Sequence, residues 1–212
     1  MAEAKDHYLA DRAATLAGEL LLSLSEEAAL SGLPSKQLGD LADRRSHELL
    51  TSLLKEAFPE DSILSEEGPD SYKRLAAERI WILDPLDGTR EFSEGGRGDW
   101  AVHVALVEQE VPTVGAVALP AMRKTFTNYT MTALPEFDGP VRIVDSRTRP
   151  GPVAELLAEK LSGELIRMGS AGAKAMEVVQ GHAEVYAHSG GQYEWDSCAP
   201  VAVALASGLH AS

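Results

Sequence analysis

The apolar positions at the start of the chain predict two long helices. From Asp6 to Leu24 apolar residues recur at steps of three and four, which is the spacing of one helix face. After the breaker Ser31-Gly32-Leu33-Pro34, a second helical pattern runs from Leu41 to Ala57, and Phe58-Pro59 stops it. We therefore expect a helical pair before any strand.

Short apolar runs then predict a largely antiparallel sheet, because they are bounded by turn residues and follow one another as hairpins do. The expected strands are Ser62–Ser65, Ile80–Leu83, Ala101–Val107, Thr113–Leu119 and Lys124–Met131. Ala133–Pro140 contains two prolines and a glycine and is the best linker candidate.

Beyond the linker, strand and helix patterns alternate, which is typical of an α/β unit. The expected elements are strand Val141–Val144, helix Val153–Leu161, strand Leu165–Met168, a helix near Lys174–Val179, a strand near Ala183–Ala187 and a last helix beginning around Trp195-Asp196. We predict an α/β fold with an N-terminal helix and antiparallel-sheet domain, 1–139, and a smaller C-terminal α/β domain, 140–212. The chain stops just after a helix that would normally return to a sheet, so we expect the second domain to be truncated.

Composition and charge narrow the class of protein. The chain has 212 residues, 44% of them hydrophobic, which is enough to bury a core. Its longest apolar stretches fall well short of about 20 continuous residues, so we expect no membrane span. Met1 is followed by Ala-Glu-Ala-Lys-Asp rather than by a basic segment and an apolar core, so we expect no secretion signal and a cytoplasmic protein. A net charge of −14 argues against nucleic acid as a partner. The single cysteine, Cys198, predicts neither a disulfide within the chain nor a zinc site.

The most informative segment is an apolar strand that ends in acid, Ile80 to Phe92. Asp84 and Asp87 lie three residues apart with a proline between them, so the turn lets both carboxylates point off the end of the strand. Such carboxylates repel each other unless a cation lies between them, and oxygen ligands suit magnesium, with the Leu86 carbonyl able to complete the shell. Gly88 and the residue after it are expected to open a short helix whose free amides favour an anion.

Each acidic segment also has a simpler interpretation when taken alone. The Asp-Pro-Leu-Asp-Gly-Thr turn could be a solvated loop, and Glu66-Glu67 before a glycine is common in surface turns. Asp196 could be an acid that complements a helix dipole, and Asp43 could be a solvated helix charge.

In combination, the Glu-Glu-Gly, Asp-Pro-Leu-Asp-Gly-Thr and Trp-Asp segments resemble the lithium-sensitive, magnesium-dependent phosphatase superfamily that includes inositol monophosphatase. The resemblance spans Lys36 to Leu209. It implies a layered fold of alternating helix and sheet layers, with the active site between the two domains. It also implies direct in-line attack of an activated water on phosphorus, without a phosphoenzyme.

The resemblance assigns roles to individual positions, together with two or three Mg²⁺ ions per site. The implied metal ligands are Glu66, Asp84, Asp87, Asp196 and the Leu86 carbonyl. Glu67 is expected to support them from outside the ligand set. Asp43 and Thr89 match the pair that orients and deprotonates the attacking water.

Within the superfamily, Thr89-Arg90-Glu91-Phe92 looks more like the 3'(2'),5'-bisphosphate nucleotidases of the CysQ type than like inositol phosphatases. The resemblance implies hydrolysis of adenosine 3',5'-bisphosphate to AMP and phosphate. A bisphosphate needs cationic side chains for its second phosphate, and Arg147 and Lys174 are the candidates. The expected substrate contacts are Glu66, Leu86, Asp87, Gly88, Thr89, Arg147, Ser170, Lys174 and Asp196.

Several alternatives stay open from the sequence. Activity on inositol 1-phosphate or fructose 1,6-bisphosphate would use the same site, and a non-catalytic protein that binds a phosphorylated ligand is an alternative of another class. Gly191 to Asp196 departs from the superfamily pattern, so base preference is undetermined. None of the six histidines has a metal-binding spacing, and each is expected to be structural or exposed. The sequence does not indicate the oligomeric state, and a homodimer is the assembly to test for.

Overall fold

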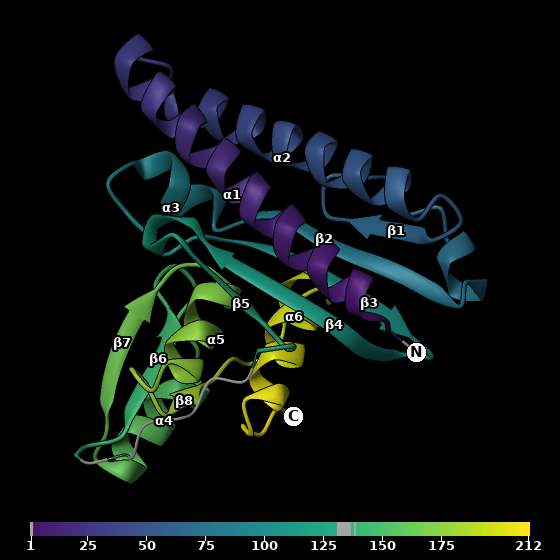
Figure 1. The fold of residues 1–212 in the computed structure, drawn as a ribbon. Helices are drawn as coiled ribbons and strands as arrows, with labels where there is room; N and C mark the ends of the chain where they lie inside the picture. Colours follow the sequence, from purple (N-terminus) through teal and green to yellow (C-terminus); the bar gives the residue numbers. More distant parts are fainter. Residues whose placement is uncertain (1, 131–136, 138) are drawn as a thin grey trace.

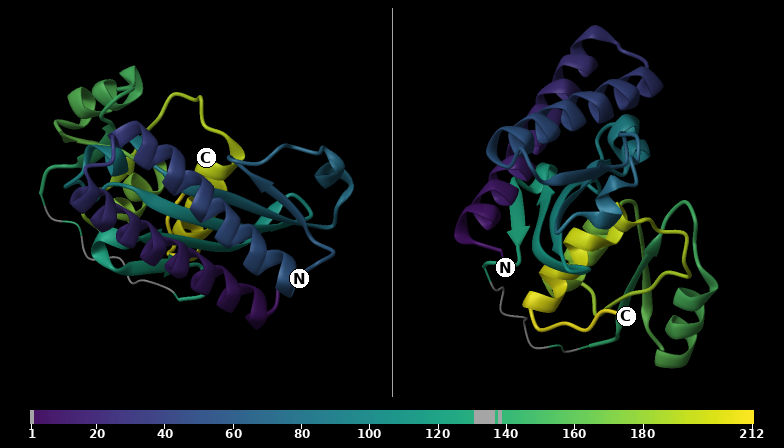
Figure 2. Two further views of the ribbon diagram at one scale, coloured as in Figure 1. Left: turned by 90° about the horizontal axis from the view of Figure 1, so that it is seen from above. Right: turned by 90° about the vertical axis from the view of Figure 1, so that its right-hand side faces the viewer.

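The computed structural model describes residues 2–130, 137 and 139–212 and has a layered architecture of helices and sheets. Two long helices cover one face of a five-stranded sheet, and two shorter helices cover the other face (Figure 1). A smaller three-stranded sheet and one further helix lie beyond them (Figure 2). The predicted layered α/β fold is therefore confirmed.

The outer helical layer consists of α1 (Ala4–Ser31) and α2 (Ser35–Ala57). The first helix is longer than its periodicity predicts and ends at Gly32, whose φ of 69° is left-handed and readily adopted by glycine. Gly18 lets α1 approach the sheet closely, because a Cβ there would lie 2.7 Å from Pro120 Cγ. Small side chains thus bring this layer close to the sheet.

The central sheet has the strand order β1-β2-β3-β4-β5. Its strands are β1 (Ser62–Ser65), β2 (Arg79–Asp87), β3 (Ala101–Glu108), β4 (Val111–Leu119) and β5 (Lys124–Thr127). Only the β1–β2 pairing among them is parallel, as expected for a largely antiparallel sheet. Short 3₁₀ helices, η1 (Lys73–Ala76) and η2 (Pro120–Met122), and the six-residue α3 (Thr89–Glu94) connect the strands.

The second face of this sheet packs on α5 (Ala171–Val179) and α6 (Glu194–Ala206). Both faces are apolar, so the sheet separates two hydrophobic clusters, one under α1 and α2 and one under α5 and α6. Because α6 packs against the first sheet, the last helix of the chain returns to the N-terminal part of the molecule (Figure 2). The proposed boundary between 139 and 140 stays a prediction.

The small sheet is entirely parallel, with the order β7-β6-β8, and α4 (Pro152–Leu161) packs on β6 and β7. Its strands are β6 (Arg142–Ser146), β7 (Glu164–Met168) and β8 (Val185–Tyr186). The last strand has two residues, shorter than predicted. The fifth strand of the large sheet is also shorter than predicted, and its expected end at Met131 lies outside the described residues, as does most of the expected linker.

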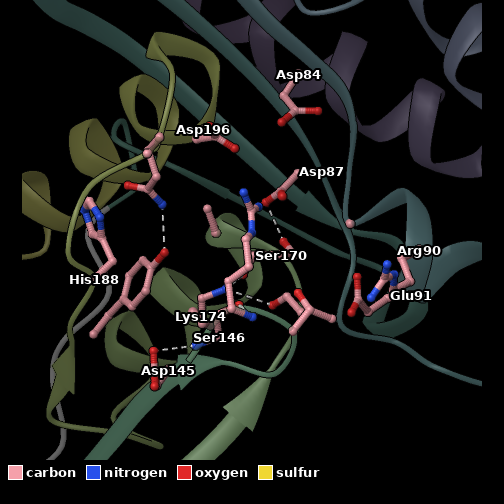
Figure 3. Close-up of a pocket in the computed structure, with 18 of the residues that line it drawn as sticks. Asp84, Asp87, Arg90, Glu91, Asp145, Ser146, Ser170, Lys174, His188 and Asp196 are labelled. Atoms are coloured by element: carbon pink, nitrogen blue, oxygen red, sulfur yellow. Dashed lines mark hydrogen bonds between the residues drawn. The ribbon is translucent and has the colours of Figure 1, made fainter. Parts of the chain in front are cut away.

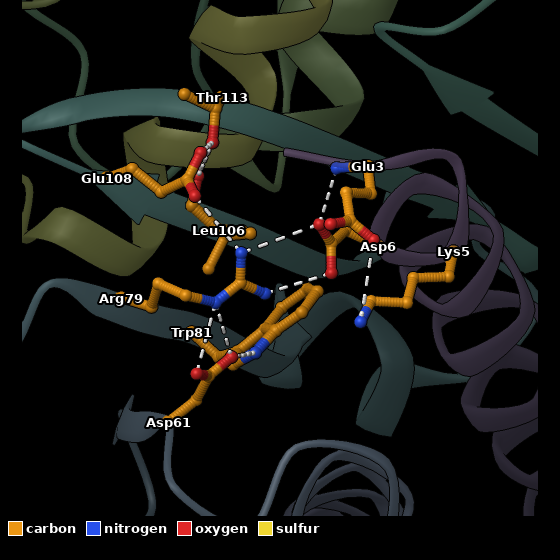
Figure 4. Close-up of polar contacts among 9 residues, drawn as sticks. All are labelled: Glu3, Lys5, Asp6, Asp61, Arg79, Trp81, Leu106, Glu108 and Thr113. Atoms are coloured by element: carbon orange, nitrogen blue, oxygen red, sulfur yellow. Dashed lines mark hydrogen bonds and ion pairs between the residues drawn. The ribbon is translucent and has the colours of Figure 1, made fainter. Parts of the chain in front are cut away.

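A buried ion cluster fastens the start of α1 to the sheet (Figure 4). Arg79 on β2 contacts Asp6 at 2.9 Å, Asp61 at 3.0 Å and Glu108 at 3.0 Å. Trp81 Nε1 donates a hydrogen bond of 2.9 Å to the same Asp61. One guanidinium therefore connects a helix, a loop and two strands. Across the described residues, no helix is both long enough and apolar enough to cross a membrane.

Candidate active site

Two strand ends bring the first three acids together. Because β1 and β2 run in parallel and Ser65 pairs with Leu83, their carboxyl ends meet at one edge of the sheet. Glu66 follows β1 directly and its backbone N–H donates to the Leu83 carbonyl at 3.2 Å. Asp84 and Asp87 are both residues of β2, which runs past the expected end at Leu83, and they lie on either side of an irregularity in its pairing with β3. Both residues are buried: Asp84 is 1% exposed and Asp87 is 8% exposed.

Asp196 joins this group from the first turn of α6. Its Oδ2 accepts a hydrogen bond from the Tyr193 backbone N–H at 2.7 Å, which fixes the start of the helix. Figure 3 shows Asp84, Asp87 and Asp196 on one side of a cavity. The structure thus gathers four of the sequence-predicted ligands, Glu66 included, around one cavity.

The pKa values of three of these carboxylates are raised, because burial and mutual repulsion disfavour their ionised forms. Burial, followed by the charges of Asp196 and Glu67, raises the pKa of Glu66 to about 7. Burial and the neighbouring acids also raise the pKa of Asp84 well above its usual range, and burial raises that of Asp196. Ionised carboxylates this close together repel one another, and a bound cation would remove that repulsion.

The chemistry of these donors fits a hard divalent cation. All the candidate side-chain ligands are carboxylates, and the Leu86 backbone lines the same cavity. Oxygen-only ligands of this kind suit Mg²⁺ rather than zinc, which prefers sulfur and nitrogen. Oxygen atoms of Asp84 and Asp87 and a nitrogen of His103 lie within 4.8 Å of one another. The residues present therefore fit a magnesium site.

Asp43 and Thr89 form the predicted pair beside the acids. The Thr89 hydroxyl lies 3.4 Å from Asp43 Oδ1 and 3.1 Å from the Leu86 carbonyl, and it can donate to either. Burial, then the charges of Glu67 and Glu66, raises the pKa of Asp43 to about 7. A carboxyl with that pKa is suited to accept a proton near neutral pH.

The cavity has a volume of about 470 Å³, and cationic as well as acidic side chains line it. Arg90, Arg149 and Lys174 line it, together with Gly88 and Ser170. Lys174 is 5% exposed, and its ammonium donates to the carbonyls of Gly169 and Ser170. Burial lowers the pKa of Lys174.

Arg147, a predicted substrate contact, is held elsewhere. Its guanidinium pairs with Glu91 at 2.6 Å and with Glu94 at 2.9 Å, and it does not line the cavity. The next arginine, Arg149, does line it. Sequence patterns could not separate the two, because only the fold places Glu91 beside the first of them.

Ser170 has a more specific role than its prediction as a substrate contact. It caps α5 with φ 52°, and its hydroxyl donates to Asp87 Oδ2 at 2.5 Å while accepting from Ala173 N–H at 2.9 Å. Ser170 therefore holds a candidate metal ligand in place as well as lining the cavity.

His103 is buried, in agreement with the expectation that each histidine is structural or exposed, but the sequence did not indicate that it contacts Asp87. It pairs with Asp84 across the β2–β3 ladder, and its Nε2 lies 3.2 Å from Asp87 Oδ2. Burial tends to raise the pKa of Asp87, but His103, Ser170 and the Gly172 N–H together hold it below its usual value. A single histidine in an apolar strand carries no sequence signal for such a contact.

The layered α/β fold and the buried carboxylate cluster fit a metal-dependent phosphoric monoester hydrolase. A family model described as the inositol monophosphatase family matches residues 7–134 and 141–210. The chain belongs to the inositol monophosphatase family.

Several named relatives of the chain act on nucleotides, according to their names. It is 47% identical to the "3'-phosphoadenosine 5'-phosphate phosphatase" of Mycobacterium leprae, covering 100% of this chain and 82% of that protein. It is 30% identical to the "3'(2'),5'-bisphosphate nucleotidase CysQ" of Salmonella typhimurium, over 80% of this chain and 73% of that one. The crystal structure of CysQ from Bacteroides thetaiotaomicron matches with a TM-score of 0.83 and 29% identity, covering 96% and 87% of the two chains.

Proposed function

We propose that this protein hydrolyses the 3'-phosphate of adenosine 3',5'-bisphosphate, releasing AMP and inorganic phosphate in the presence of Mg²⁺. The observation that carries the proposal is one cavity lined both by carboxylates that can hold a cation and by cationic side chains that can contact a phosphate. The names of the relatives support the same substrate.

The 3'-phosphate would lie against the acidic side of the cavity, on the cation held by Glu66, Asp84, Asp87, Asp196 and the Leu86 carbonyl. Bound Mg²⁺ supplies charge neutralisation and polarises the phosphate oxygens there. Without a cation, this face would repel a phosphate dianion, because the chain carries a net charge of −14.

Asp43 and Thr89 perform the proton transfer in this proposal. The Thr89 hydroxyl, held between Asp43 and the Leu86 carbonyl, orients a water molecule for attack. As the water oxygen bonds to phosphorus, its proton passes toward Asp43 and the bond from phosphorus to the 3'-oxygen breaks. The released 3'-oxygen takes a proton from solvent, so the products are an alcohol and inorganic phosphate.

The second phosphate would lie near Arg149 and Lys174, which take the place that the sequence analysis gave to Arg147 and Lys174. Arginine can contact a phosphate through two parallel hydrogen bonds, whereas Lys174 adds a point charge on a buried stem. A monophosphate leaves these cations unused, so a bisphosphate is the favoured substrate.

The test is phosphate release from adenosine 3',5'-bisphosphate, inositol 1-phosphate and fructose 1,6-bisphosphate, first with Mg²⁺ and then with a chelator. We expect nucleotide preference that the chelator abolishes. Preference for a sugar phosphate would contradict the proposed substrate but would agree with the proposed metal site. Tight binding of the bisphosphate without phosphate release would contradict catalysis.

Three further features are proposals of the same kind. We expect two or three Mg²⁺ ions per site, a count to be measured by calorimetry. We expect a cytoplasmic protein, to be checked by fractionation of cells. A homodimer is the assembly to look for by light scattering.

A further inference from the structure

Both ring nitrogens of His103 face hydrogen-bond acceptors inside the protein. The side chain is 1% exposed on β3. Its Nδ1 lies 2.9 Å from the Trp195 backbone carbonyl, which can only accept, so Nδ1 carries a proton. Its Nε2 lies 3.2 Å from a carboxylate oxygen of Asp87, within ion-pair distance although not aligned as a hydrogen bond.

The surroundings of Nε2 and of the facing Asp87 oxygen are crowded. A Cβ on Gly172 would lie only 2.0 Å from Nε2, so the α5 backbone closes that side of the ring. The facing oxygen, Asp87 Oδ2, already accepts from Ser170 Oγ at 2.5 Å and from Gly172 N–H at 2.7 Å. These contacts favour Oδ1 as the Asp87 oxygen that faces a cation, with His103 outside the ligand set.

We propose that His103 is a positioning residue that fixes the orientation of the Asp87 carboxylate and ties it to the first turn of α6, so that Asp87 and Asp196 bind one cation together. The ring connects three separate elements, because Asp87 ends β2, His103 lies on β3 and Trp195 begins α6. A side chain that contacts a metal ligand from outside the ligand set orients that ligand and tunes the affinity of the site for the metal. The inference rests on the proposed function, because it takes the acidic cluster to be a Mg²⁺ site.

The experiment measures Mg²⁺ binding by calorimetry without substrate for the wild type, His103→Leu and His103→Asn. His182→Leu is the matched control, because His182 lies on the surface beside Glu177 and away from the cavity. We expect both His103 variants to bind Mg²⁺ about 10 to 100-fold more weakly with an unchanged number of ions. At saturating Mg²⁺, the KM for the bisphosphate should stay close to the wild-type value.

The outcomes separate this inference from the proposed function. Wild-type Mg²⁺ affinity in the His103 variants would overturn the inference. Loss of one bound ion would also overturn it, because His103 would then be a ligand. If circular dichroism shows that His103→Leu does not fold, His103→Asn, which keeps a polar side chain, decides on the same criteria. A wild-type protein that neither binds Mg²⁺ nor releases phosphate would contradict the proposed function itself.

Discussion

At the residue scale, Asp87 is the acid whose two oxygens have separate tasks. Oδ2 is occupied by Ser170 and Gly172, so the charge offered to a cation comes from the other oxygen. In Asp87→Asn the amide oxygen can keep those donors while the NH₂ group faces the metal and cannot bind it. We expect kcat/KM to fall by at least about 100-fold with the melting temperature in chelator unchanged, measured by phosphate release and circular dichroism. Near-normal activity of this variant would contradict the role of Asp87 as a metal ligand.

Asp43 and Thr89 should act as one unit. Removing the proton acceptor in Asp43→Asn is expected to lower kcat by about 100 to 10,000-fold while Mg²⁺ affinity stays unchanged. Adding Thr89→Ala should cost little more, because both changes interrupt the same proton transfer. Asp40→Asn, an exposed acid on the same helix, is the control. If the fold-loss of kcat in the double variant equals the product of the two single fold-losses, the two residues act separately.

The sequence was most informative where chemistry depends on residues close together in the chain. The proximity of Asp84 and Asp87 could be predicted because they are three residues apart, although the expected turn between them is an irregularity in the pairing of β2 with β3. His103 could not, because its importance comes from the β2–β3 register and from the distant Trp195 carbonyl. For the same reason Arg147 was assigned to the substrate, although Glu91 holds it away from the cavity.

At the element scale, the Glu91–Arg147 pair connects α3 to the loop after β6. The Glu91 side chain packs against Gly169, where any larger residue would collide with it, because a Cβ on Gly169 would lie 2.2 Å from Glu91 Cδ. The pair anchors the loop that carries Arg149 to the cavity. We expect Arg147→Gln to raise the KM for the bisphosphate several-fold with a smaller change in kcat, because the loop is positioned less well. The KM of the Glu91→Gln/Arg147→Gln double variant should not exceed the higher of the two single-variant values. Unchanged KM in all three would contradict this role.

The cluster around Arg79 is expected to stabilise the fold without affecting the chemistry (Figure 4). Arg79→Leu would leave the fully buried Asp6 without its guanidinium partner. Breaking a buried pair in this way costs about 3 to 5 kcal/mol, whereas an exposed pair contributes about 1 kcal/mol or less. Urea unfolding of Arg79→Leu beside Arg45→Leu, whose contact with Glu48 is exposed, measures the difference. Equal effects of the two substitutions would contradict the prediction.

Element types were predicted better than element lengths. Amphipathic periodicity indicated α1, but its last turns up to Ser31 contain weaker apolar spacing and are defined by the Gly32 cap. The two-residue β8 shows the opposite error, because an apolar run permits a strand while only pairing with β6 decides its length. The parallel β1–β2 pairing, which places Glu66 beside Asp84, likewise depends on tertiary contacts.

At the scale of the whole molecule, the acidic site makes stability depend on pH and Mg²⁺ together. Asp43 and Glu66 have folded-state pKa values of about 7, above the usual range of about 4 for carboxyl groups in unfolded chains. The folded protein therefore binds protons that the unfolded chain has already released between these values. Since stability falls with pH wherever the folded state binds more protons, the free energy of unfolding in chelator should decrease from about pH 4 to about pH 7.

A bound cation replaces those protons, so Mg²⁺ should stabilise the protein little at pH 5 and by several degrees of melting temperature at pH 8. Thermal unfolding at both pH values, with Mg²⁺ and with chelator, tests this directly. Glu66→Gln should show a flatter pH dependence in chelator and a smaller Mg²⁺ effect, because it removes one of the titrating groups. An equal Mg²⁺ effect at both pH values would mean that the cation binds without displacing protons, and the raised pKa values would then not describe the metal-free protein.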